Sequence, residues 1–213
     1  MMEPRAEIRR RTRLSPVARR SQLMECAIEV FSRRGIGRAG HAEIAEEAKV
    51  SVATVFNYFN TREELVDEVL GEVETFIRQL MTEAYGDHHP ICDSIRRHVE
   101  LFVDVAYDRP DHANIWLEWS SSVRDEVWPR YVKLLDEILE HITPRLQKAL
   151  DRGEIESELS ALALARILTS FGYLMMQMIN APERPLRSEV VETVYQYVTA
   201  PIKVGVPQAL ALA

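Results

Sequence analysis

The chain has 213 residues and a formal net charge of −7, with 46% hydrophobic and 28% charged residues, which is ordinary for a soluble globular protein. Its two cysteines, Cys26 and Cys92, predict neither a disulfide framework nor a cysteine metal cluster, so we interpret both as reduced thiols. The arginine-rich N-terminus is followed by no apolar segment, which argues against a secretory signal and favours a cytoplasmic location.

The charge is unevenly distributed along the chain. Residues 1–60 contain 11 Lys and Arg against 7 Asp and Glu, a balance of +4. The remainder carries the other 15 basic and 26 acidic residues, a balance of −11. A basic end on an acidic body is expected when that end contacts phosphates, so the negative total does not exclude DNA as a partner.

Residues 1–14 are predicted to form a flexible basic arm, because they are rich in arginine and poor in apolar residues. Arg11 and Arg13 are candidates to reach into a narrow, A·T-rich minor groove, although a solvated charge run is the alternative. Other arginines nearby are expected to neutralise phosphates without reading sequence: Arg9, Arg10, Arg19 and Arg20. Ser15 and Pro16 then predict the start of a helix that ends at Gly35.

The segment 41–59, HAEIAEEAKVSVATVFNYF, predicts two short helices, 41–48 and 51–58, joined by a tight turn. Together with the preceding helix they are typical of the three-helix unit that inserts a recognition helix into the major groove. An ordinary helical hairpin is the alternative. His41 begins the first short helix, where its backbone N–H could meet a phosphate or serve only in capping. The outer face would carry the donors and acceptors for DNA: Ser51, Thr54, Asn57 and Tyr58.

The rest of the chain predicts further helices, so the fold class is all-α. A capping box, Thr61 to Glu64, opens a long helix, and others are expected at 91–108, 112–121, 125–151, 158–180 and 187–200. The stretch 159–179 is interpreted as a buried core helix rather than a membrane span. We expect an arm (1–14), a helix-turn-helix domain (15–62), a regulatory and dimerisation domain (63–200) and a tail (201–213). Apolar faces on the last helices favour a four-helix interface between two subunits, formed by Ile167, Leu174, Met178, Val190, Val194 and Val198.

The sequence contains no strong pattern of catalytic residues. Glu118, Asp125 and Glu126 lack a second set of partners, and the histidine pair 88–89 lacks carboxylates at metal-ligand spacing. Neither a phosphate-binding glycine loop nor a nucleophile elbow occurs. We therefore expect neither an enzyme nor a cofactor or metal. A purely protein-binding helical module is disfavoured by the polar surface at 51–57 and the arginine arm.

The segment IAEEAKVSVATVFNYFNTREELV resembles the DNA-binding domain of the TetR family of transcriptional regulators. RTRLSP at 11–16, QLME at 22–25, FSRRGIGRAGHAEIAE at 31–46, VSVATVFNYF at 50–59 and WLEWSSSVRDEVWP at 116–129 resemble its HapR/LuxR-type branch, the quorum-sensing master regulators of vibrios. That wider family usually has glycine in the turn, where this chain has Lys49, and a non-glycine residue costs roughly 1 kcal/mol in a left-handed conformation.

The resemblance implies a homodimer that binds a pseudo-palindromic operator and represses some promoters while activating others. It also supports the minor-groove reading of the arm. A ligand-induced repressor of an efflux or catabolic operon is the nearest alternative. The resemblance further implies an apolar cavity for a small apolar ligand beside Trp116, although pure packing of this tryptophan is the alternative; its expected lining is Ile77, Leu80, Met81, Trp116, Leu117 and Gly172.

Overall fold

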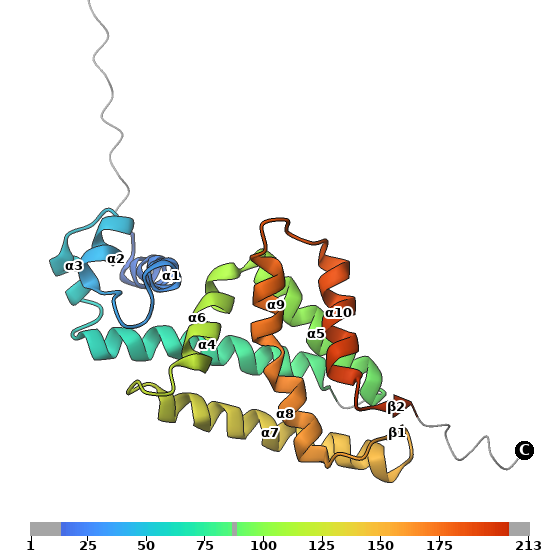
Figure 1. The fold of residues 1–213 in the computed structure, drawn as a ribbon. Helices are drawn as coiled ribbons and strands as arrows, with labels where there is room; N and C mark the ends of the chain where they lie inside the picture. The colour runs from blue at the N-terminus through green and yellow to red at the C-terminus, as the bar shows by residue number, and fades with distance from the viewer. Residues whose placement is uncertain (1–13, 87–88, 205–213) are drawn as a thin grey trace, which may run out of the picture.

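The computed structural model describes residues 14–86 and 89–204, and its fold is helical, as predicted. A compact head is formed by α1 (Pro16–Arg34), α2 (His41–Glu47) and α3 (Val52–Phe56), and the long helix α4 (Arg62–Ala84) leads from it into the body (Figure 1). The body consists of α5 (Ile91–Asp108), α6 (Pro110–Ser121), α7 (Trp128–Asp151), α8 (Ala161–Ser170), α9 (Gly172–Ile179) and α10 (Arg187–Thr199).

Helix α1 begins and ends where its sequence signals lie. The Ser15 hydroxyl accepts a hydrogen bond from the Ala18 N–H (3.2 Å), and Pro16 occupies the first turn, where its missing N–H costs nothing. Gly35 ends the helix with φ +89°, a conformation that glycine adopts cheaply. Between these ends one face is buried and forms the head's core with α2 and α3; it carries Leu23, Ala27, Val30 and Phe31.

Helix α4 joins the head to the body. The Thr61 hydroxyl accepts from the Glu64 N–H (3.1 Å), while the Glu64 carboxylate accepts from the Asn60 backbone N–H (2.8 Å). The predicted capping box is thus present in a variant that reaches one residue further back. Its buried face runs into the body's core through Leu65, Val69, Val73 and Ile77.

The helix expected over 158–180 is divided at Phe171 into α8 and α9. The hydroxyls of Thr169 and Ser170 donate to the carbonyls of Arg166 (3.1 Å) and Ile167 (2.9 Å), so they compete with the backbone for helical acceptors. Gly172 follows and lowers helix propensity further. The single-helix prediction was therefore wrong at this point.

By length and composition, Ala161–Ile179 could cross a membrane, and it is the one such stretch among the described residues. Of its apolar window, 39% is buried inside the protein. The core helix of a soluble protein meets the same criteria, so this stretch is weak evidence for a span.

A short antiparallel ladder, β1 (Ile155–Glu156) with β2 (Lys203–Val204), corrects the expectation of helix throughout. Ile155 pairs with Val204, and the Ser157 hydroxyl donates to the Pro201 carbonyl (2.7 Å). Lys203 and Val204, assigned to the tail by sequence, are thereby attached to the end of α7.

The apolar residues expected at the subunit interface have two different positions in the structure. Val190, Val194 and Val198 are fully buried within the protomer, where α10 packs on α5. That part of the interface prediction was wrong, because the valines belong to the core of one chain. Ile167, Leu174 and Met178 remain only partly buried on α8 and α9.

Candidate nucleic-acid interface and regulatory cavity

The turn between α2 and α3 is closed by the one non-glycine residue with positive φ in the described chain, Lys49 (φ 54°). The Val50 N–H donates a hydrogen bond to the Ala45 carbonyl (2.9 Å), which fixes the direction of α3 relative to α2. The Lys49 ammonium is exposed and has no ion-pair partner among the described residues. It is a candidate phosphate contact that sequence reasoning missed, although a lysine inside a helix-turn-helix turn is a visible signal.

Ser51 opens α3 as its N-cap. Its Oγ accepts from the Thr54 backbone N–H (3.2 Å) and lies 2.8 Å from the Thr54 hydroxyl. Ser51 is exposed and Thr54 is half-exposed. The pair is thus held by the helix terminus with oxygens accessible from solvent, which suits contacts to phosphates or base edges.

Asn57 and Tyr58 lie just past the end of α3, one turn after Thr54. Asn57 is exposed, and its side-chain amide makes no hydrogen bond with the described residues. Tyr58 is half-buried against the head's core. The structure therefore brings together all four polar residues predicted between 51 and 58, and it leaves the amide of Asn57 with unused donors and an acceptor.

His41 has a different position from the others, because its side chain is buried. Its Nε2 lies 2.8 Å from the Phe59 carbonyl oxygen, and its ring stacks on Phe56 with centroids 3.9 Å apart. The imidazole therefore ties the start of α2 to the end of the helix-turn-helix. Only the backbone N–H of His41 remains for the predicted phosphate contact.

The arginines expected to contact DNA are only partly described. Arg11 and Arg13 lie outside the described residues. Arg20 was expected to neutralise phosphates, but its guanidinium pairs with Glu68 of α4 (2.7 Å) and lies 5.4 Å from the centroid of the Phe59 ring. Arg20 thus joins α1 to α4, and its expected contact with phosphates stays a prediction.

Apolar side chains share the exposed face of α3, which sequence reasoning did not anticipate. Val52 is 42% exposed, Phe56 is 45% exposed, and Ala53 is exposed between them. Apolar side chains on a recognition helix suit contact with the methyl group of thymine. The surface therefore combines groups for phosphates, for base edges and for thymine methyls.

An apolar cavity lies in the body, where the resemblance implied one. Four predicted residues line it, namely Ile77, Trp116, Leu117 and Gly172. Its free volume is about 10 Å³, about the space of one water molecule. The other residues that line the cavity were not all anticipated, and their side chains leave little free volume. They are Phe76, Phe102, Val105, His112, Ala113, Met175 and Met176.

A second small cavity of about 20 Å³ shares Trp116 and Gly172 with the first and is lined by Met81. His98 also lines it; its Nδ1 lies 3.0 Å from the Tyr85 hydroxyl. Burial lowers the pKa of His98 to about 3, so its ring is neutral. The remaining predicted pocket residue, Leu80, is buried on α4 outside the lining of both cavities.

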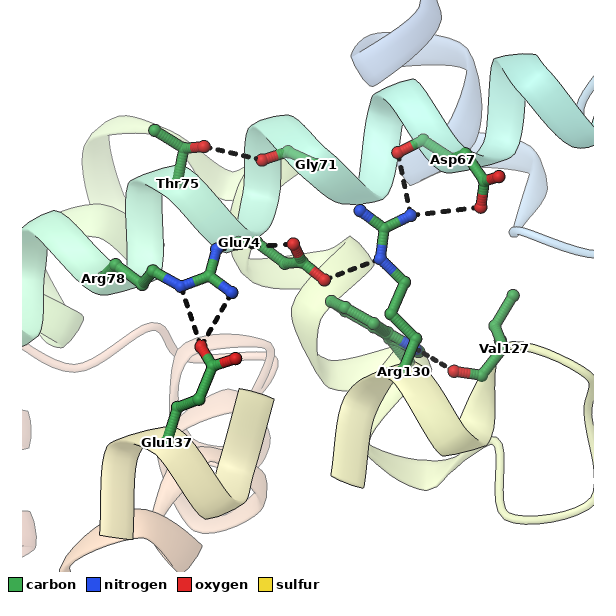
Figure 2. Close-up of polar contacts among 9 residues, drawn as sticks. Asp67, Gly71, Glu74, Thr75, Arg78, Val127, Arg130 and Glu137 are labelled. Carbon is green, nitrogen blue, oxygen red and sulfur yellow. Dashed lines mark hydrogen bonds and ion pairs between the residues drawn. The ribbon is translucent and has the colours of Figure 1, made fainter. Parts of the chain in front are cut away.

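A ladder of ion pairs fastens α4 to α7 (Figure 2). Arg130 of α7 binds Glu74 (2.6 Å) and the carbonyl of Asp67 (2.9 Å) on α4. Glu74 is shared with Arg78 (3.4 Å), which in turn binds Glu137 of α7 (2.9 Å). The helix that carries the head is therefore held along its side by the body.

This geometry defines the class of the molecule: a helix-turn-helix DNA-binding head on a helical body. The family model "Bacterial regulatory proteins, tetR family" matches residues 23–69. HTH-type transcriptional regulator LuxR of Vibrio harveyi is 41% identical over 174 residues, which cover 81% of this chain and 84% of that protein. The chain belongs to the TetR family and is a DNA-binding transcriptional regulator.

Other similar proteins extend the comparison. HTH-type transcriptional regulator TtgR of Pseudomonas putida is 27% identical, with 71% of this chain and 75% of that protein covered. The structure of AibR with isovaleryl coenzyme A and operator DNA superimposes with a TM-score of 0.73, at 11% identity, over 86% of this chain and 99% of that one. Bacillus subtilis FadR with stearoyl-CoA gives 0.70, at 16% identity, over the same shares. At these identities the solved structures establish the fold alone.

Proposed function

We propose that this regulator binds a pseudo-palindromic operator as a homodimer in the cytoplasm. The observation that carries the proposal is the exposed polar face of α3 and its C-terminal turn, where Ser51, Thr54 and Asn57 are held in place by the head's core. Tyr58 and the His41 backbone are candidates for phosphates, and Arg11 and Arg13 for the adjacent minor groove.

A homodimer is supported by apolar side chains left at the surface of the last helices. Leu162 of α8 is 43% exposed, Tyr173 of α9 is 65% exposed and Tyr197 of α10 is 53% exposed. Ile167 and Met178 are partly exposed on α8 and α9. Two copies meeting through α8, α9 and α10 would bury these side chains in a helical interface between the subunits. The symmetry would place two recognition helices about 34–36 Å apart, one turn of DNA.

A link to quorum sensing is the favoured biological role. It rests on the LuxR-type residues in both the head and α6, in particular the segment that runs from Trp116 to Pro129. The alternative is a ligand-induced repressor of an efflux or catabolic operon. One relative supports this alternative: it is named a nicotine-responsive repressor, HdnoR, and is 41% identical over 115 residues, which cover 54% of this chain.

Genome-wide mapping of bound sites at low and high cell density tests the proposal. We expect many sites that share a two-fold symmetric motif, with occupancy that changes with density. Sites confined to one neighbouring efflux or catabolic operon would favour the alternative. Sites without a symmetric motif would contradict binding as a two-fold dimer.

A further inference from the structure

The residue just past the C-terminal end of α1 is hydrogen-bonded by side chains of two other helices. The carboxylate Oε1 of Glu118 on α6 accepts a hydrogen bond from the Ile36 backbone N–H (2.9 Å). On the other side of the same residue, the Ile36 carbonyl accepts from the Arg62 guanidinium at the start of α4 (2.7 Å). The short segment that ends α1 is therefore fixed between the body and the base of α4.

The residue before Ile36 is Gly35, whose backbone conformation favours glycine. A Cβ added to Gly35 would lie 2.9 Å from Oε1 of Glu118, closer than real side chains approach, and the φ of +89° already disfavours any other residue. Gly35 thus serves both to end α1 and to admit the carboxylate of Glu118.

Glu118 is partly buried, and burial raises the pKa of its carboxyl group, while the Ile36 N–H and Arg38 lower it and Asp125 raises it further. One turn earlier on α6, the Asn114 amide donates to the Ser32 hydroxyl of α1 (3.1 Å). These two bonds are carried by one face of α6, and α1 packs along this helix. Of the two, the charged acceptor is expected to be the stronger.

Helix α6, whose Glu118 binds the end of α1, also forms a wall of the apolar cavity. Trp116 and Leu117, which line the cavity, directly precede Glu118 on α6. A displacement of α6 at the cavity would therefore move the carboxylate that holds the end of α1. Because α1 packs on α2 and α2 packs on α3, a shift of Glu118 would be passed through α1 and α2 to the recognition helix.

We propose that Glu118 is a positioning residue, through which the body fixes the DNA-binding head and so sets the separation of the two recognition helices. The inference rests on the proposed dimer and its two-fold operator. Each added base pair moves one half-site by about 3.4 Å along the DNA and rotates it about the DNA axis. A dimer whose heads are held firmly therefore binds one half-site spacing tightly and binds shorter or longer spacings weakly.

An operator is first selected from random-sequence DNA with the wild-type full chain. The test then compares three versions of it, in which the half-sites have the selected spacing, a spacing one base pair shorter and a spacing one base pair longer. We expect the wild type to bind the selected spacing best. Glu118→Ala should lose about tenfold at that spacing and much less at the other two, which flattens the preference. Glu118→Gln should restore most of it, because the amide oxygen can accept the same N–H bond.

Asp104→Ala is the matched control, since Asp104 of α5 pairs with Arg187 of α10, and no hydrogen bond or ion pair among the described residues joins it to the head. It should leave the spacing preference unchanged, and all variants are compared as folded dimers by circular dichroism and light scattering. An equal loss for Glu118→Ala at every spacing, or no loss, would overturn the inference. A wild type without any spacing preference would instead contradict the proposed two-fold operator.

Discussion

The Nε2 atom of His41, at the first turn of α2, lies 2.8 Å from the carbonyl oxygen of Phe59, eighteen residues further along the chain. The same ring stacks on Phe56 at the end of α3. One buried side chain therefore joins the first and last turns of the helix-turn-helix, and it holds α3 at a fixed angle to α2.

His41→Ala should destabilise the head by about 1–3 kcal/mol, because it removes the hydrogen bond and the stacking partner and leaves the Phe59 carbonyl without its donor. Urea unfolding followed by circular dichroism measures this loss, and operator affinity should fall with it. His141→Ala, which removes an exposed histidine from α7, is the control and should change neither quantity. Unchanged stability of His41→Ala would mean that the buried bond contributes nothing.

Local signals in the sequence were sufficient for the helix starts and the turn of the head. Ser15, Ser51 and Thr61 predicted helix starts, and each hydroxyl caps a helix. Lys49 adopts the left-handed conformation expected for its turn. These features depend on neighbours a few residues away, so a linear pattern contains them.

Contacts between distant segments could not be predicted in this way. Glu118 binds Ile36 across 82 positions, and sequence reasoning treated it only as an unpaired surface acid. The valine stripe of α10 has the spacing of an interface but packs on α5, because periodicity shows that a face is buried and not which chain covers it.

Asn57→Ala should weaken specific operator binding by roughly 1–3 kcal/mol, because the exposed amide has unused donors and an acceptor for a base edge. The fold should be unaffected, since no described residue bonds to this amide. Fluorescence anisotropy with the selected operator and with unrelated DNA measures the specific part. Gln147→Ala on α7, another exposed amide, is the control, and equal affinities of mutant and wild type would exclude a contact by Asn57.

The buried His98 predicts a loss of stability in acid. Its pKa is lowered to about 3 in the folded protein, against an ordinary value near 6.5, so between these values the unfolded chain binds a proton that the folded chain does not. Its contribution is fully present above about pH 6.5 and is lost as the pH falls. Between about pH 7.5 and about pH 5 the loss should be about 2 kcal/mol.

His98→Gln separates this contribution from general acid denaturation. The glutamine can bond to Tyr85 but does not titrate, so its free energy of unfolding should lose about 2 kcal/mol less than that of the wild type over the same interval. The exposed His141→Gln variant should behave as the wild type does. Parallel pH profiles for wild type and His98→Gln would show that His98 does not titrate on unfolding.

Gly172 lies where the two small cavities of the body meet, and it contributes to the walls of both. A Cβ built on it would have no heavy atom within 4 Å, and its φ is not in the positive range. Gly172→Ala should therefore be tolerated, with operator affinity close to that of the wild type. The alanine variant is the natural control for a larger replacement.

Gly172→Phe should lower operator affinity without unfolding the dimer. The free volume of the two cavities, about 10 and 20 Å³, cannot hold a phenyl ring, so a ring that enters them displaces their walls, which include Trp116 of α6. A displaced α6 can favour one arrangement of the two DNA-binding heads over another. The size of the effect on DNA binding equals the difference in free energy that it creates between those arrangements. Such couplings are typically about 1–3 kcal/mol, or about 5- to 150-fold in affinity. Anisotropy titrations with the selected operator, on variants shown to be dimeric by light scattering, measure the change. If Gly172→Phe binds as tightly as Gly172→Ala in a folded dimer, the space beside Trp116 is packing and has no influence on the head.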